Sequence, residues 1–104
     1  MNIKVHSVKI DADKDLNSFI KERVDKLELF HDRIMGSEVF LRMDGASKTD
    51  DKIVEIRMTI PGKELFAKKQ GKSFEEATDL AVDALRRQLK KSKQKVQSKK
   101  STPQ

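Results

Sequence analysis

The chain has 104 residues, a length that fits one domain with a small hydrophobic core. Charged residues make up 38% of it, and the formal net charge is +6. It contains no cysteine, which excludes disulfides and thiolate chemistry and fits a reducing compartment. No stretch approaches about 20 apolar residues, and the first residues lack the apolar run of a signal peptide. We therefore expect a soluble cytoplasmic protein.

The excess positive charge is concentrated at the C-terminal end. Residues 86–104 contain eight Lys or Arg and no Asp or Glu, whereas residues 1–85 hold the remaining 15 basic and all 17 acidic residues. The body of the chain is therefore slightly acidic. A block of a single sign produces a localised electric field, which favours a polyanionic partner.

The first two predicted elements are a strand and a helix. Apolar residues alternate through residues 2–10, and the alternation slips at His6 and Ser7, which suggests a β-bulge. Asp13 is a suitable N-cap, because its carboxylate can accept a hydrogen bond from a free amide of the first helical turn. Apolar residues then recur at helical spacing, which predicts a helix over residues 14–30.

Three further strands are predicted. Residues 37–43 and 52–60 alternate, and the pattern in 52–60 indicates one buried face and one wet face, as in an antiparallel sheet. The polar segment 44–51 predicts a loop, and the Pro-Gly pair at 61–62 predicts a turn. Residues 63–69 are highly charged for a strand, which suits an exposed position or a sheet edge.

The last helix begins at a capping box, in which Ser73 and Glu76 can each accept a hydrogen bond from the other's backbone amide. We expect this helix to end near residue 95, and residues 96–104 to form a disordered basic tail. The order βαβββα predicts an α+β two-layer sandwich within residues 1–95, with two helices packed on one face of a four-stranded sheet. The apolar positions of the last helix are Phe74, Ala77, Ala81, Leu85 and Leu89.

Cations on the two helices are the candidate binding residues. In the last helix they lie opposite the apolar positions, so we expect them to point into solvent. The helix dipole alone would favour two or three cations there, fewer than are present. In the first helix the cations alternate with acids, so an ordinary salt-bridged surface explains them equally well. The candidates of the last helix are Arg86, Arg87, Lys90, Lys91, Lys93 and Lys95.

The aromatic residues bear on the kind of polyanion. There are five Phe and no Trp or Tyr; Phe19, Phe30 and Phe74 fit core positions, and Phe40 is undecided. For Phe66 we favour packing in the core or at an edge over a stacking contact. Proteins that bind single strands usually offer aromatic platforms, so their scarcity here favours structured RNA held through phosphates and shape. A membrane surface fits less well, because the basic helix lacks a large apolar insertion face.

Catalysis has little support in the sequence. His6 and His31 are far apart, and neither has a second ligand at metal-binding spacing. The four glycines are isolated, so there is no glycine-rich phosphate loop. We expect a binding protein without catalytic residues, metal or cofactor.

Two segments combine into a specific pattern. Residues 26–34 read KLELFHDRI, and residues 79–93 read DLAVDALRRQLKKSK. They resemble the K-L-E followed by D-R-I, and the I-D-x-x-I-D-K-L-x-R-Q-L-x-K-x-K, of the short ribosome hibernation-promoting factor family, also called ribosome-associated translation inhibitors. The element order and the basic last helix are similar too, so the resemblance covers residues 1–95.

The resemblance implies a non-enzymatic translation inhibitor, monomeric when free. Members of the family bind the small ribosomal subunit and its ribosomal RNA in the decoding channel, where they block the messenger and transfer RNA sites. Their basic contact positions correspond to Arg23 and Lys26 on the first helix and to Arg87 and Lys91 on the second. Neither a membrane nor a small-molecule substrate is implied.

The chain departs from the family at several positions. Ala84 and Leu29 stand where cations are usual, and the segment 73–76 replaces a tyrosine-containing one. The C-terminal dimerisation domain of the long family form is absent, so we do not expect this chain to pair ribosomes through it. Two other functions stay open: a general double-stranded RNA-binding protein, although such domains start with a helix, and a protein-interaction regulator of transcription.

Overall fold

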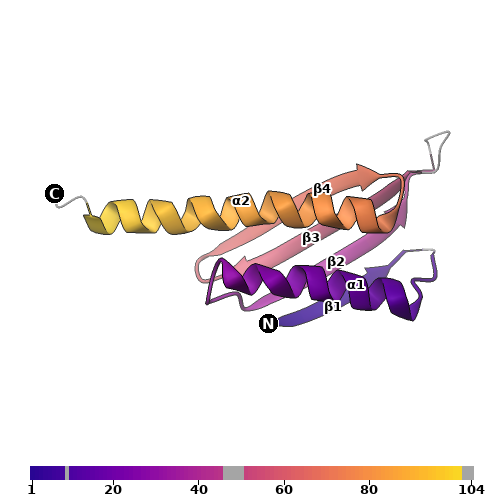
Figure 1. The fold of residues 1–104 in the computed structure, drawn as a ribbon, viewed down its shortest axis with the longest axis horizontal. Helices are drawn as coiled ribbons and strands as arrows, with labels where there is room; N and C mark the ends of the chain where they lie inside the picture. Colours follow the sequence, from indigo (N-terminus) through magenta and orange to yellow (C-terminus); the bar gives the residue numbers. More distant parts are fainter. Residues whose placement is uncertain (9, 46–50, 102–104) are drawn as a thin grey trace.

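The computed structural model describes residues 1–8, 10–45 and 51–101, and from residue 93 onward it describes only the backbone of the last helix. The chain folds in the predicted order βαβββα, with a short 3-10 helix, η1, after the first α-helix (Figure 1). The elements are β1 (Asn2–Ser7), α1 (Lys14–Asp25), η1 (Lys26–Leu29), β2 (Gly36–Met43), β3 (Lys52–Ile60), β4 (Lys63–Gly71) and α2 (Phe74–Ser101).

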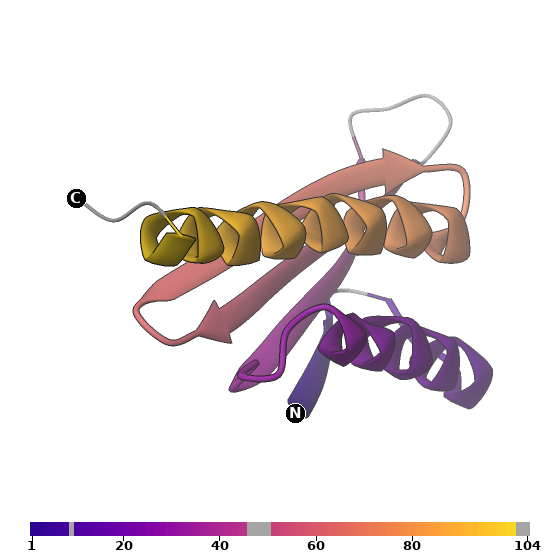
Figure 2. The same ribbon diagram turned by 60° about the vertical axis from the view of Figure 1, so that its left-hand side comes forward.

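The four strands form one mixed sheet in the order β1-β2-β3-β4. The neighbours β1 and β2 are parallel, which requires the crossover through α1, whereas β2, β3 and β4 pair antiparallel. Both helices lie on the same face of the sheet, and the opposite face is uncovered (Figures 1 and 2). The predicted two-layer α+β sandwich is confirmed, including the edge position of the charged strand β4.

The hydrophobic core fills the space between the helices and the covered face of the sheet. In β3 every second residue from Val54 to Ile60 is buried, as the alternation predicted. Each fully buried Leu or Val contributes about 1.5–3 kcal/mol relative to an exposed side chain. The helical layer is held to the sheet by fully buried apolar side chains on one side of each helix: Ile20 and Val24 in α1, and Ala77, Ala81, Leu85 and Leu89 in α2.

The predicted signals at the ends of the elements are present. The carboxylate of Asp13 accepts a hydrogen bond from the amide of Leu16 at 2.8 Å. The hydroxyl of Ser73 accepts one from the amide of Glu76 at 3.0 Å, which is one half of the predicted capping box. Gly62 has φ +75° in the turn between β3 and β4, a conformation that glycine adopts without steric cost.

Two boundaries differ from the sequence-based expectation. β1 ends at Ser7, and its pairing with β2 runs without interruption, so the slip in alternation marks the end of the strand and not a bulge. α2 continues to Ser101 because its basic part contains no glycine or proline that would stop it. The predicted tail, 96–104, is thus helical as far as Ser101; residues 102–104 lie outside the described residues, and a domain boundary at residue 95 stays a prediction.

Candidate nucleic-acid interface

The two helices lie side by side (Figure 2). Charged and aromatic residues line the seam between them. The guanidinium of Arg23 in α1 lies 4.8 Å from the ring centroid of Phe19. Its Nε also pairs with Oδ1 of Asp79 in α2 at 3.4 Å. One of the candidate cations of α1 therefore already has a partner across the seam, and this ion pair helps to fix α1 against α2.

Further along the seam, two cations of α2 lie over the ring of Phe30, just after η1. The guanidinium carbon of Arg86 is 6.0 Å from the ring centroid, and the ammonium of Lys90 is 5.2 Å from it. Arg86 is half-buried, whereas Lys90 is exposed. The expectation that every cation of α2 points freely into solvent is therefore wrong for Arg86, because the adjacent aromatic ring draws its side chain into the seam.

Asp83 precedes the basic block by one helical turn and neutralises part of it. Arg86 donates to Oδ1 of Asp83 through Nη2 at 2.6 Å and through Nε at 3.2 Å, and Arg87 donates to Oδ2. Hydrogen bonds from Arg86, and then from Arg87, lower the pKa of the Asp83 carboxyl below its usual value. Although no acid follows residue 86 in the sequence, Arg86 and Arg87 are therefore already paired with Asp83.

The outward side of α2 carries exposed cations. Arg87 is the most exposed residue of the pair bound by Asp83, with 74% of its side chain accessible, and Lys91 follows one turn later and is also exposed. At this i, i+4 spacing the two cations form one row on the helix surface. Lys93 and Lys95 lie on the helical backbone of α2, but their side chains are outside the described residues. Figure 1 shows this part of α2 projecting beyond the end of the sheet.

Lys26 stands apart from the others at the start of η1. It is exposed, and its ammonium lies 3.8 Å from the Glu22 carboxylate one turn earlier. An exposed pair at that distance contributes little free energy, so Lys26 can exchange this partner for another anion at small cost. The structure therefore brings Arg23, Arg86 and Lys90 together at the seam, places Arg87 and Lys91 outward on α2, and leaves Lys26 on η1.

The described residues contain no group of three or more His, Cys, Asp or Glu side chains that could hold a metal ion. His31 accepts a hydrogen bond from the amide of Arg33 at its Nδ1, whereas His6 pairs with Glu38 on the opposite face of the sheet. The two histidines therefore do not form one site. Within the same described part of the chain, no helix is long and apolar enough to cross a membrane.

Comparison with known proteins identifies the family of this chain. Residues 3–97 match the family described as "Sigma 54 modulation protein / S30EA ribosomal protein". The chain belongs to this family. A curated relative from Pseudomonas putida, named "Ribosome hibernation promoting factor", is 30% identical over 98 residues, which cover 94% of this chain and 92% of the relative.

Solved structures share the fold. The N-terminal domain of Protein Y from Thermus thermophilus superposes with a TM-score of 0.78 at 23% identity, over 88% of this chain and 98% of that one. A "ribosomal subunit interface protein" from Coxiella burnetii superposes with a TM-score of 0.80 at 20% identity, over 89% and 98% of the two chains. At these identities the likeness shows the fold alone.

Two positions at which this member of the S30EA family departs from the pattern now have a structural description. Leu29, in place of a usual cation, is 81% exposed at the end of η1. Ala84 is half-buried on α2, next to the buried Leu85. The Leu29 side chain offers neither a charge nor a hydrogen-bond donor, so Lys26 is the one cation of η1.

Sequence reasoning missed the seam itself. The pairs Arg23–Asp79 and Arg86–Phe30 join residues more than 50 positions apart, and periodicity within one helix carries no information about such partners. A local signal was present for Asp83, which lies on the same helix as Arg86 and Arg87 at i, i+3 and i, i+4 spacing. The packing of α1 against α2 shows that Asp79 pairs with Arg23.

Proposed function

We propose that this protein is a non-enzymatic, ribosome-associated translation inhibitor of the cytoplasm. In this proposal its helical layer binds small-subunit ribosomal RNA in the decoding channel and blocks the messenger and transfer RNA sites. The observation that carries it is the outward row of cations on α2, together with the name of its close relatives. Arg87 and Lys91 are exposed, lie one turn apart and stand at the start of a helix segment that extends beyond the sheet.

The mechanism we propose is electrostatic. Each RNA phosphate that a cation neutralises releases condensed counterions, so binding should weaken steeply as salt rises. Arg87 and Lys91 would contact phosphates directly. The helical spacing of α2 continues their row to Lys95 and places Lys93 on the neighbouring strip with Arg86 and Lys90. The seam would contribute three further cations, Arg23, Arg86 and Lys90. The carboxylates that now pair with the two arginines, Asp79 and Asp83, are exposed enough for phosphate to replace them.

The test is co-sedimentation with purified ribosomes across a range of salt concentrations, with a messenger–transfer RNA complex as competitor. The double variant Arg87→Glu with Lys91→Glu should bind about 100-fold more weakly at low salt and should show a shallower salt dependence. The competitor should displace the wild-type protein. Unchanged ribosome binding by the double variant would overturn the electrostatic mechanism.

A matched control is available at the opposite ends of the helices. Lys14 opens α1 and Lys72 precedes α2, and both are exposed. The variant Lys14→Glu with Lys72→Glu changes the net charge by the same amount, but away from the basic end of α2. It should retain most of the affinity. An equal loss in both double variants would mean that overall charge matters and not a defined surface.

The words "Sigma 54 modulation protein" in the family description favour a second candidate function. In it, the protein is a regulator that binds a protein of the transcription machinery. The same experiment separates the two functions, since a protein partner would survive nuclease treatment and high salt. A general double-stranded RNA-binding protein would instead bind a plain RNA duplex as tightly as it binds ribosomes. The competitor would then have no effect on ribosome binding.

A further inference from the structure

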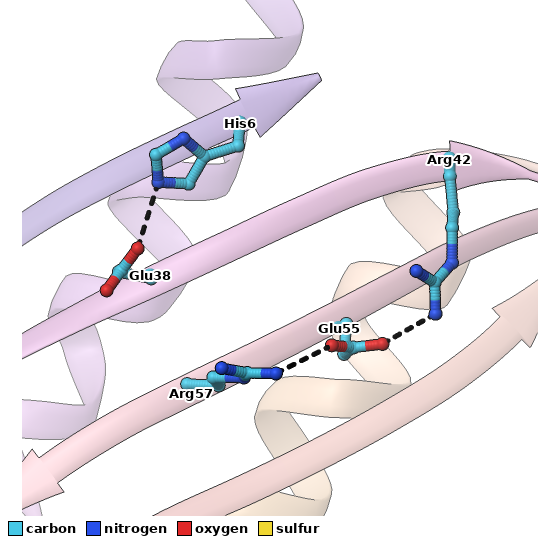
Figure 3. Close-up of polar contacts among 5 residues, drawn as sticks. All are labelled: His6, Glu38, Arg42, Glu55 and Arg57. Atoms are coloured by element: carbon cyan, nitrogen blue, oxygen red, sulfur yellow. Dashed lines mark hydrogen bonds and ion pairs between the residues drawn. The ribbon is translucent and has the colours of Figure 1, made fainter. Parts of the chain in front are cut away.

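The uncovered face of the sheet carries an ordered network of charged side chains, shown in Figure 3. His6 Nε2 lies 3.0 Å from Glu38 Oε2, across the parallel pair β1–β2. Arg42 Nη2 lies 2.7 Å from Glu55 Oε1, and Arg57 Nη2 lies 3.9 Å from Glu55 Oε2. Glu55, expected on a wet face, is nearly buried between these two arginines. The carboxylates thus hold an imidazole and two guanidinium groups in place.

Flat side chains cross this face in a diagonal row, with one member from each strand. His6 of β1 stacks on Phe40 of β2, with ring centroids 4.9 Å apart and ring planes 18° apart. The guanidinium of Arg57 in β3 lies 5.4 Å from the Phe40 centroid. Phe66 of β4 is the direct cross-strand partner of Arg57. We call these four residues the stacking row.

The stacking row is accessible. Phe66 is 46% exposed, and His6 and Arg57 are exposed, whereas Phe40 is half-buried between its two neighbours. A phenylalanine on the outer face of an edge strand gains little from the core, because the buried side chains of β4 are those of Leu65 and Ala67. The outer surfaces of the row therefore remain open to a flat ligand.

The chemistry of the face narrows the choice of ligand. Ile53 is the one aliphatic side chain longer than alanine among the described outward positions of β1–β4, so the large flat groups that the face presents are aromatic rings and guanidinium planes. Aromatic rings and guanidinium planes are the groups on which unpaired nucleobases stack. Lys4 and Lys68 point from the same face and form no ion pair within the described part of the chain, so they can meet phosphates.

We propose that the stacking row binds unpaired bases of single-stranded RNA, with Lys4 and Lys68 taking the flanking phosphates. This site is distinct from the cationic helical layer, which lies on the opposite side of the sheet. The outward acids Glu38, Glu55 and Glu64 nearly balance the cations of the face. RNA binding by the stacking row should therefore depend more on stacking than on charge. Its affinity should fall less with rising salt than the affinity for ribosomes does.

The experiment is a fluorescence-anisotropy titration of the full chain with a labelled eight-nucleotide single-stranded RNA of mixed sequence, compared with the same sequence as a duplex. It is carried out in the Arg87→Glu, Lys91→Glu background, which reduces the electrostatic contribution of α2. In that background Phe66→Ala should weaken binding of the single strand about tenfold. Phe66→Trp should retain it, because indole preserves the stacking surface.

Leu80 provides the matched control, since it is 44% exposed but lies on α2, on the other side of the molecule. Leu80→Ala should bind the oligonucleotide as the background protein does. Equal affinity of Phe66→Ala and its background, equal losses in Phe66→Ala and Leu80→Ala, or no measurable binding of the single strand would each overturn the proposal. None of these results would affect the ribosome proposal, which is measured by salt-sensitive co-sedimentation.

A protein partner would give a different result. The oligonucleotide would then bind no protein in the series, while Phe66→Ala would lower co-sedimentation with ribosomes in the otherwise unchanged chain. That outcome would assign the uncovered face to protein docking and would also overturn the proposal.

Discussion

The two halves of α2 differ in almost every physical property. Residues 74–85 contain four acids and no Lys or Arg, and they bury Ala77, Ala81 and Leu85 completely against the sheet. Residues 86–101 contain eight Lys or Arg and no acid, and much of this half projects past the sheet (Figure 1). We call residues 74–85 the anchor, because they pack against the sheet, and residues 86–101 the basic half, because they carry the positive charge.

This division shows how one helix can serve stability and binding separately. Acids near the N-terminus of a helix and cations near its C-terminus both interact favourably with the helix dipole. The segregation of charge therefore stabilises α2 itself. The buried half fixes the direction of the helix, and the projecting half extends a positive field along that direction. Substitutions of the buried side chains of α2, including Leu89 in the basic half, should then change the unfolding free energy, whereas substitutions of the exposed cations should change binding.

The largest expected effect on stability is in the anchor. Leu85→Ala removes a fully buried side chain between α2 and the sheet, and should lower the free energy of unfolding by about 3 kcal/mol through lost burial and the cavity left behind. Urea denaturation measures this change. Leu80→Ala, on the exposed side of the same half, should change it by less than about 0.5 kcal/mol. Equal losses in the two variants would contradict the assignment of an anchor side.

The sequence predicts those structural features that depend on residues close together in the chain. The apolar positions of α2 recur at helical spacing, and Asp13 and Ser73 precede their helices, so elements, caps and core positions followed from short windows of sequence. The row formed by Arg87 and Lys91 was predictable for the same reason. These features require no knowledge of which segments meet in space.

The features that were missed depend on long-range pairing. The stack of His6 on Phe40 requires the parallel register between β1 and β2, which brings together residues 34 positions apart. Phe66 pairs with Arg57 across the nearby β3–β4 turn, but the alignment of this pair with Phe40 depends on the longer-range β2–β3 register. The sequence argument against a single-strand platform counted aromatic residues but did not include histidine and arginine planes. It could not foresee that the sheet would align them with Phe40 and Phe66.

A smaller effect is expected where the anchor begins. Ser73→Ala removes the acceptor for the Glu76 amide and should lower the free energy of unfolding by about 1 kcal/mol. Ser73→Asp should retain most of the stability, because a carboxylate also caps the amide and suits the helix N-terminus. Thermal unfolding measures both variants. Ribosome binding at temperatures well below unfolding should be unchanged in both, since the basic half lies at the other end of α2.

The smallest effect is expected at the junction of the two halves, where Asp83 binds Arg86 and Arg87. Asp83→Asn should release the two guanidinium groups and raise affinity for ribosomes about two- to fivefold at low salt, a gain that higher salt reduces. Glu75→Gln is the matched control, because it removes one acid from the same helix but away from the arginines. Equal gains in both variants would attribute the effect to net charge.

The same junction makes a prediction about pH. The pKa of the Asp83 carboxyl is lowered in the folded protein by hydrogen bonds from Arg86 and Arg87. The stabilisation from these contacts is therefore fully present above the unfolded-state value of about 3.9, and is lost as the pH falls through the lower folded-state pKa. Asp83→Asn lacks this titration, so the stability difference between wild type and variant should shrink on acidification from pH 6 to pH 3. A constant difference would show that the arginines do not stabilise the charged carboxylate, and the junction would then impose no restraint on the basic half of α2.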